Sequence, residues 1–454
     1  MKQPLVIAMT GASGAPYAVR LLEVLLNSAI PVHLTISPAG AQVIEHNFGR
    51  IGGLGAADAH MPTAGWAHRA DMGLKAVAGR GCVAVVTHRH GQEVVLQVGV
   101  RNARLAADEA PRLEVVGGDI NAYTTKEHTC IHASFLNQHL DRAAELISDI
   151  LFHSTFPEKE INKERGVILD EIDSYLDLPE EAIQDDFEGL LFKGHALGNN
   201  ILGTAETVNK INKKDVIKFL KNNYHTDEII FAVDGGSDFQ KIIAIAEKYF
   251  GDIKTNLRNF KRLKAKKNKA IQVVKNKSII QSHAIIGSQC YGNMHPKKTA
   301  MLLLNNYLGG PGMSAKLNLE IREKQGICYT IESNYIPFSD TGIFSIYMGT
   351  DKEKMERCQK LVLKELKKLS DKKLGAISLH QAKQKFIGQI SLAEENRLSV
   401  IISLAKNIIE EGKADSLTEI YKKINLVSAQ DILSVANEVL SPANLSSLTF
   451  LPES

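Results

Sequence analysis

Apolar positions recur along the chain at two spacings, which predict short strands and amphipathic helices in a repeated order. Residues 117–151 and 325–369 each predict strands that lead into a helix with apolar residues every three or four positions. Farther along, residues 210–234 and 423–452 each open on the string Lys-Ile-Asn and predict a helix, a turn and an apolar strand. The matching order indicates a duplicated α+β unit.

The two copies differ at their beginnings. The second copy, residues 270–454, opens with the strand SHAIIGSQC and the helix KTAMLLLNNYL, and we expect it to fold on its own. The first copy, residues 112–257, has only Arg112–Val116 before its matching point. We therefore expect it to be truncated and less stable, with residues 1–111 supplying neither the missing strand nor the missing helix. The basic segment 258–269 between the copies is typical of a solvated linker.

The first 111 residues differ in composition from the rest. They hold 2 Lys and 7 Arg, whereas the remainder holds 37 Lys and 8 Arg, which suggests a fused chain. Residues 1–44 predict one βαβ fragment, with strands at 4–9 and 32–37 and a Gly/Ser turn after the first strand. Residues 45–111 are rich in Gly and Ala and indicate no function. Their strand-like strings, CVAVVTH and EVVLQVGV, predict a hairpin.

Composition excludes several classes of protein. With 454 residues, 44% of them hydrophobic, the chain is too apolar to be disordered. A formal net charge of +3 gives no reason to expect nucleic acid or an anionic membrane as a partner. Five scattered cysteines without a C-x-x-C string predict no disulfide framework. No transmembrane run or signal peptide is recognisable, so we expect a cytoplasmic protein.

Several strings of residues 112–454 resemble the insulinase/pitrilysin-like zinc metallopeptidases. They are RLEVVGGDINAYTTKEHTCIHASF, ERGVILDEIDSYLDLP, GHALGNNILGT, LGGPGMSAKL and IREKQGICYTI, and they occur in the family's order. The resemblance implies an α+β fold of two repeated α/β sandwich domains, the first truncated here and preceded by the short flavodoxin-like βαβ fragment. It also implies a peptide substrate and hydrolysis by a zinc-activated water.

In that family the two histidines of H-x-x-E-H and a distant glutamate bind zinc. The resemblance places the distant ligand at Glu171 and its supporting carboxylate at Glu164. Seven residues are about two helical turns, so both carboxylates lie on one helix face. The alternative is an acidic helix that faces water, and the string ERGVILDEI favours the ligand interpretation.

The histidine pair itself is missing. None of the 15 histidines stands in an H-x-x-E-H string. His128, Cys130 and His132 alternate along one predicted strand, so they share a face and offer metal-ligand atoms. Residues that simply line a sheet show the same pattern, and we favour that interpretation. With Glu171 alone we expect no tight zinc site and no peptidase activity from this chain by itself.

The second copy keeps a different part of the family's machinery. Arg322 and Tyr329 match the pair with which the family holds the substrate carbonyl and the tetrahedral intermediate, since a cation and a phenol suit an oxyanion. Gly309, Gly310 and Gly312 form a loop before them that permits close backbone approach. The alternative is a simple turn beside a buried tyrosine. The resemblance also allows a homodimer, or a heterodimer in which a relative carrying H-x-x-E-H supplies the zinc.

Residues 4–44 carry a second resemblance. TGASGAPYAVRLLEVL and HLTISPAGAQVI are similar to the start of a flavin prenyltransferase, which implies that Gly11, Ser13, Gly14 and Ser37 match residues that contact FMN. The family's later motifs for FMN and the prenyl phosphate do not follow. We therefore expect a remnant that does not bind FMN. The sequence leaves three hypotheses: an inactive peptidase relative, a non-catalytic partner subunit, and a flavin-binding protein.

Overall fold

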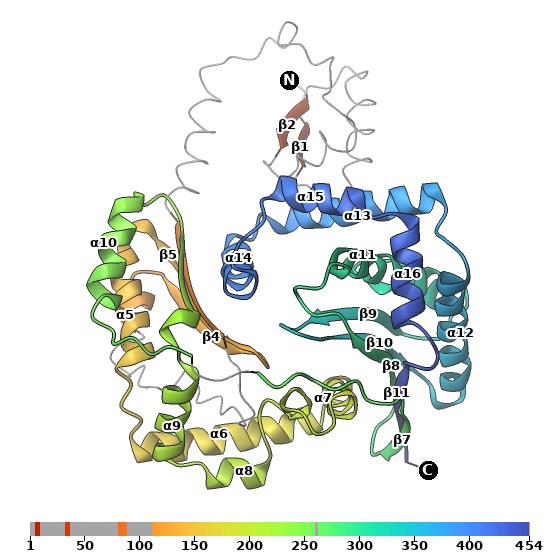
Figure 1. Ribbon diagram of the computed structural model, residues 1–454, viewed down its shortest axis with the longest axis horizontal. Coiled ribbons are helices and arrows are strands. Elements are labelled where there is room, and N and C mark those ends of the chain that lie inside the picture. The colour runs from red at the N-terminus through yellow and green to blue at the C-terminus, as the bar shows by residue number, and fades with distance from the viewer. Residues whose placement is uncertain (1–4, 10–31, 37–79, 89–110, 259–261, 454) are drawn as a thin grey trace, which may run out of the picture.

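The computed structural model describes residues 5–9, 32–36, 80–88, 111–258 and 262–453 (Figure 1). Near the N-terminus, β1 (Leu5–Met9) pairs in parallel with β2 (Val32–Ile36). The parallel pairing confirms the two strands of the βαβ fragment. The helix expected between them, at 17–27, lies outside the described residues.

The first of the two larger sheets has the order β4 (Asp119–Thr124), β5 (His128–Leu136), β3 (Arg80–His88) and β6 (Ile229–Asp234), all antiparallel. In the middle of this sheet, Val83 of β3 pairs with Ala133 on one side and with Val233 on the other. Val83 and its neighbour Ala84 are fully buried.

Strand β3 overturns two expectations from the sequence. Residues 1–111 do supply the opening strand of the first copy. The predicted hairpin between CVAVVTH and EVVLQVGV is wrong, because β5 and β6 occupy both edges of β3. The physical reason is that a strand pairs with the strands that pack beside it in the folded chain. One of the two partners of β3 is β6, which lies far along the sequence. The segment that follows this strand, residues 89–110, lies outside the described residues, so the structure does not test the expectation of a missing helix.

The second sheet repeats the first. Its order is β9 (Thr330–Pro337), β10 (Gly342–Thr350), β8 (Ser282–Cys290), β11 (Ser446–Pro452) and β7 (Gln272–Lys277). Read in this direction, its first four strands correspond to β4, β5, β3 and β6. The internal repeat is therefore confirmed, and β3 is the counterpart of β8.

The helices that follow the Lys-Ile-Asn strings begin in the same way in both copies. Asn212 caps α9 (Lys213–Asn223), and the Asp215 side chain accepts a hydrogen bond from the backbone N–H of Asn212. Ser428 and Asp431 form the same reciprocal pair at α16 (Ala429–Val439). Each reciprocal pair, known as a capping box, satisfies backbone N–H groups that have no partner within the helix. The preceding helices are α8 (Ala205–Lys210) and α15 (Leu417–Leu426).

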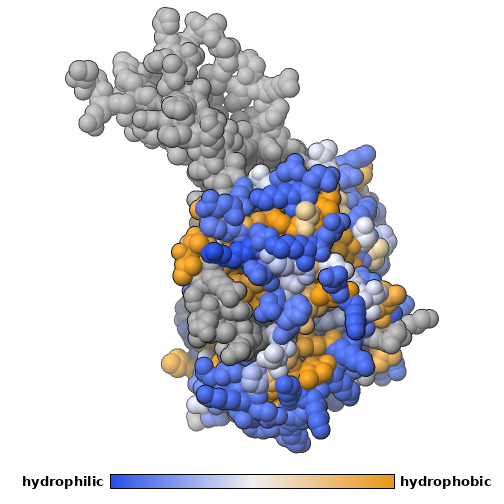
Figure 2. All heavy atoms as spheres, turned by 90° about the vertical axis from the view of Figure 1, so that its left-hand side faces the viewer, coloured by the Kyte–Doolittle hydropathy of each residue, from blue (hydrophilic) through white to orange (hydrophobic). Residues whose placement is uncertain are grey.

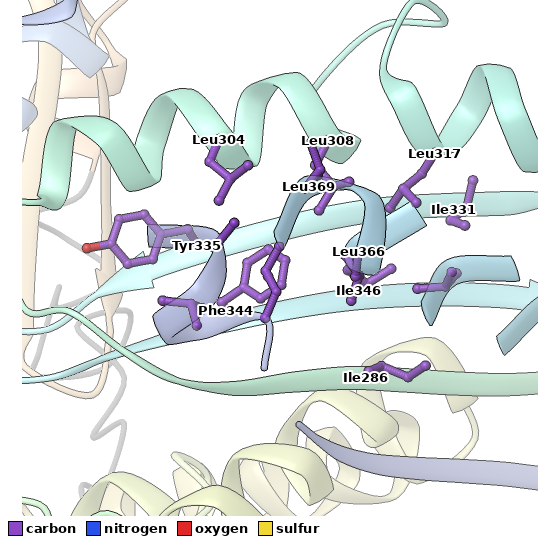
Figure 3. Close-up of a cluster of buried hydrophobic side chains, with 14 of the residues drawn as sticks. Ile286, Leu304, Leu308, Leu317, Ile331, Tyr335, Phe344, Ile346, Leu366 and Leu369 are labelled. Carbon is purple, nitrogen blue, oxygen red and sulfur yellow. The ribbon is translucent and has the colours of Figure 1, made fainter. Parts of the chain in front are cut away.

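The larger apolar core lies on one face of the second sheet, under α11 (Lys298–Gly309), α12 (Lys352–Asp371) and α16. Figure 3 shows Leu304 and Leu308 of α11 directed at the strands. Phe344 and Ile346 of β10 fill the layer beneath them. Apolar side chains recur every three or four residues along α12, which explains why this helix lies flat on the sheet.

A smaller core stabilises the first sheet. Helices α5 (Leu140–Phe152) and α10 (Phe239–Phe250) cover the face that carries Ile131, Ala133 and Phe135. The short α4 (Pro111–Glu114) adds the buried Leu113. The outer side of this half is mostly hydrophilic, with apolar atoms in separate patches (Figure 2).

Each copy of the repeat, called a half from here on, also contributes a helix to the sheet of the other copy. Helix α7 (Pro179–Leu191), from the first half, packs on β8 and β11 with Ile183, Phe187 and Leu191. Helix α14 (Arg397–Glu411), which follows α13 (Ala376–Ala393), packs on β3 and β6 with Ile401 and Ala405. Each sheet is thus covered on its second face by a helix from the other copy (Figure 1).

Candidate active site

Helix α6 (Glu158–Leu176) carries Glu164 and Glu171, the two glutamates that were expected on one helix face. It begins after Pro157, and acidic residues in its first turn favour the positive end of the helix dipole. Glu164 and Ile168 are buried, and Glu171 is half-buried. These residues are four and then three positions apart, so they lie on one face of α6.

One side chain ties α6 to a neighbouring helix, and acidic side chains lie near Tyr175 in its last turns. Arg165 donates hydrogen bonds from Nε to the Val208 carbonyl at 3.3 Å and from Nη2 to the Ile211 carbonyl at 2.7 Å, which ties α6 to the end of α8. At the other end, burial raises the pKa of Tyr175, and the carboxylates of Glu181, Glu171 and Asp185 raise it further. Glu171 therefore lies in a locally negative environment.

His128, Cys130 and His132 line the face of the first sheet that packs toward α14. His128 Nε2 lies 2.8 Å from Glu410 Oε1 of α14, and both side chains are buried. Cys130 is fully buried in the cluster with Ile401, and burial raises the pKa of its thiol to about 11. Burial also lowers the pKa of His132. The arrangement favours the sheet-lining interpretation.

The residues described do not fit a zinc ion. A zinc site needs at least three protein ligands converging on one point. Within the described ranges, no three His, Cys, Asp or Glu side chains come together in a way that could hold a metal. Glu171 has no histidine pair beside it in those ranges.

Arg322 and Tyr329 lie at the entrance to β9. Arg322 stands in a π-helical turn, Asn318–Glu323, and Gly326, at φ +60°, turns the chain between the two residues. Both side chains are exposed, and Tyr329 is 52% exposed, so the alternative of a buried tyrosine is wrong. Their exposure leaves a cation and a phenol accessible from solvent.

Asp351 orients Tyr329, and no sequence pattern singled it out. The Tyr329 hydroxyl donates a hydrogen bond to Asp351 Oδ1 at 2.8 Å, and this bond raises the pKa of Tyr329. The Tyr329 backbone N–H donates to the Gly349 carbonyl at 3.0 Å. An aspartate directly between a strand and a helix is a common helix cap, but the Asp351 side chain makes no capping hydrogen bond and accepts from Tyr329 and Lys354 Nζ instead.

The glycine loop makes the close contacts expected of it at two positions. A Cβ at Gly309 would lie 2.6 Å from the Ser333 backbone nitrogen, and one at Gly310 would lie 2.7 Å from the Asn306 Cα. Gly312 has φ +96°, which L side chains rarely adopt. The end of α11 can therefore approach β9 only because side chains are absent.

The expected FMN contacts, Gly11, Ser13, Gly14 and Ser37, lie outside the described residues. In the part of the chain that is described, no helix is long and apolar enough to cross a bilayer.

Comparison with known proteins agrees with this architecture. Residues 107–205 match the family model described as "Insulinase (Peptidase family M16)", and residues 210–386 match "Peptidase M16 inactive domain". An uncharacterized zinc protease of Rickettsia felis is 31% identical over 346 residues, which span 76% of this chain and 83% of the relative. The chain belongs to the insulinase family of peptidases.

Other relatives extend the comparison. An uncharacterized zinc protease of Bacillus subtilis is 28% identical over 340 residues, covering 75% of this chain and 82% of the relative. A peptidase inactive domain from Pseudomonas fluorescens shares the fold, with a TM-score of 0.76 at 18% identity over 83% of this chain and 93% of that one. A Helicobacter pylori protease has a TM-score of 0.73 at 22% identity, with 82% and 94% covered.

Proposed function

We propose that this chain is an insulinase-family protein that hydrolyses no peptide by itself. The observation that carries the proposal is the absence of H-x-x-E-H from the whole sequence, while the family strings around Glu164, Glu171, Arg322 and Tyr329 remain. Without the two histidines a zinc ion lacks most of its protein ligands, and without the motif's glutamate no general base stands beside a bound water.

Peptide binding is the function that the remaining residues support. Arg322 supplies a fixed positive charge, and Tyr329, held by Asp351, supplies a hydroxyl at the surface beside the edge strand β9. A peptide carbonyl accepts hydrogen bonds from the Arg322 guanidinium, and the Tyr329 oxygen, whose single proton is donated to Asp351, accepts one from a peptide N–H. We propose that the second half binds extended peptide and that the first half lacks the means to cleave it.

A partner subunit is the second candidate, favoured by the completeness of the second half. A relative that carries H-x-x-E-H would provide zinc in such a pair, and this chain would provide Arg322 and Tyr329. Size-exclusion chromatography of the chain with such a relative, followed by a cleavage assay, tests this role. Cleavage that exceeds the relative's own rate and is lost with Arg322→Ala would support it, and an unchanged rate would exclude it.

Restoration of the missing segment tests the proposed inactivity. The chain and a chimera with residues 1–111 replaced by a family segment bearing the strand, the H-x-x-E-H helix and its loop are compared for zinc content and cleavage of an unfolded peptide. We expect zinc and activity only in the chimera, with both lost on Glu171→Ala. Stoichiometric zinc in the original chain, lost on Glu171→Ala, would contradict the proposal. Bound FMN and yellow colour would instead support the flavin hypothesis.

A further inference from the structure

A cavity of about 670 Å³ lies at the beginning of α11, whereas the glycine loop and Arg322 follow the end of this helix. The cavity is lined by residues of α11, α13 and α15, by the end of α14 and by the start of α16, all in the second half (Figure 1). A volume of this size is typical of pockets that take one small molecule. Neither Arg322 nor Tyr329 lines it, so it is separate from the proposed peptide site.

One part of the lining is apolar. Ala300 of α11 and Ile424 of α15 are buried, and so is Val427, which directly follows α15. Phe386 and Ile390, one turn apart on α13, are half-buried and line the same space. Apolar side chains of a ligand gain free energy when such a surface removes them from water. The lining therefore favours a ligand that carries aliphatic side chains.

The rest of the lining pairs charges of opposite sign. Lys298 Nζ lies 2.7 Å from Glu411 Oε1, and both side chains are mostly buried. Asp415 pairs with Lys423, and its Oδ1 lies 3.4 Å from Lys413 Nζ. A ligand with a single charge would meet like charges as well as opposite ones in this lining. A ligand that carries both signs fits it better.

Two of the lining charges keep capacity for a ligand. Asp431 Oδ2 accepts both hydrogen bonds from Ser428, at 2.8 and 2.7 Å, and Asp431 forms no ion pair within the described part of the chain. The hydrogen bond from the Ser428 side chain lowers the pKa of Asp431, so this carboxylate stays charged. Lys413 is 65% exposed and meets Asp415 only at 3.4 Å. A negative and a positive group, on different elements, can therefore each take one end of a ligand.

We propose that this cavity binds a short apolar peptide with free termini. The terminal ammonium group pairs with Asp431, the terminal carboxylate pairs with Lys413, and the side chains contact Phe386, Ile390 and Ile424. The ligand is thus a zwitterion, which matches the paired charges, with an aliphatic body, which matches the apolar lining.

Calorimetric titration of the full chain with trileucine tests the proposal. N-acetyl-trileucine amide keeps the side chains but has no terminal charges, and it should bind about tenfold more weakly because two ion pairs are lost. Triglycine keeps both charges but has no apolar side chains to bury, so it should show no binding.

Two lysine variants form a matched pair, since both residues are exposed and neither substitution disturbs the core. Lys413→Gln should weaken trileucine binding about two- to fivefold, the range of an exposed ion pair. Lys422→Gln removes a charge from α15 at a position that does not line the cavity, and it should leave binding unchanged. Arg322→Ala should also leave it unchanged, because the two sites are separate.

Absence of trileucine binding, or equal binding of the blocked peptide, would overturn the proposal. Tighter binding of decanoate than of trileucine would also overturn it, since a single negative charge would then suffice. Equal effects of Lys413→Gln and Lys422→Gln would point to general surface charge instead of this cavity. Loss of trileucine binding in Arg322→Ala would assign the peptide to the site beside β9, which supports the proposed function and overturns this second site.

Discussion

At the scale of single residues, the contact between the halves depends on a buried carboxylate. Glu127, in the turn between β4 and β5, is 3% exposed. Its Oε2 accepts a hydrogen bond from the Ser339 backbone N–H, and its Oε1 accepts one from the Ser339 hydroxyl, both at 2.9 Å. Arg262 of the connecting segment pairs with Glu127, and its Nε lies 3.2 Å from Asp340. The segment expected to be a solvated linker therefore holds a structural arginine.

Glu127→Ala is expected to destabilise the protein by about 3 kcal/mol, because it leaves Arg262 without its main partner and removes the acceptor of Ser339. The matched control is Glu206→Ala, which breaks an exposed helical pair with Lys210 and should cost at most about 0.5 kcal/mol. Denaturant unfolding of both variants measures the difference. Equal effects would show that the Glu127 cluster contributes no more than a surface pair.

At the scale of elements, two glycines in helices should respond to alanine in opposite directions. Gly309→Ala places a Cβ 2.6 Å from the Ser333 backbone nitrogen, so α11 must shift away from β9, at a cost of about 1–3 kcal/mol. Gly388 lies inside α13 with no atom within 4 Å of its added Cβ, and Gly388→Ala should stabilise by about 0.5–1 kcal/mol. Thermal unfolding of the two variants checks the opposite signs, and a stabilising Gly309→Ala would contradict the close packing.

Strand β3 gives the second prediction at this scale. A chain that begins at Arg112 lacks the central strand between β5 and β6, so both would expose unpaired backbone edges. A chain that begins at Arg80 keeps the strand. Limited proteolysis should therefore degrade residues 112–257 quickly in the shorter chain and slowly in the longer one. Equal resistance would mean that the first sheet is stable without β3.

The helices could be predicted from residues close together in the sequence, whereas the pairing of the strands could not. The Lys-Ile-Asn strings, and the three- and four-residue spacing in α5 and α12, predicted helices that the structure contains. The partners of β3 were not predictable from its apolar run, because a strand buried on both faces carries no mark of its neighbours. The link between Asp351 and Tyr329 was hidden for the same reason, since it depends on how β9 meets α12.

At the scale of the whole molecule, the exchange of α7 and α14 changes the expectation that the second copy folds on its own. The outer face of the second sheet carries Ile285, Tyr347, Leu448 and Phe450, all buried. Their cover is α7, which belongs to the first copy in sequence. A face of this kind, left without its helix, is an exposed apolar patch of the sort that promotes association.

A fragment of residues 262–453 is therefore expected to bind an apolar dye such as ANS and to self-associate, because Leu448 and Phe450 lose the contact with Phe187. A longer fragment, residues 179–453, restores α7 on the same chain and should stay monomeric with little dye binding. Light scattering and dye fluorescence of the two fragments at equal concentration measure the difference. In the longer fragment, Phe187→Asp should bring back association, since a charge at that position cannot be buried against β8 and β11. A monomeric short fragment that binds no dye would show that the second copy is a self-sufficient domain and that the exchange of helices serves only to join the halves.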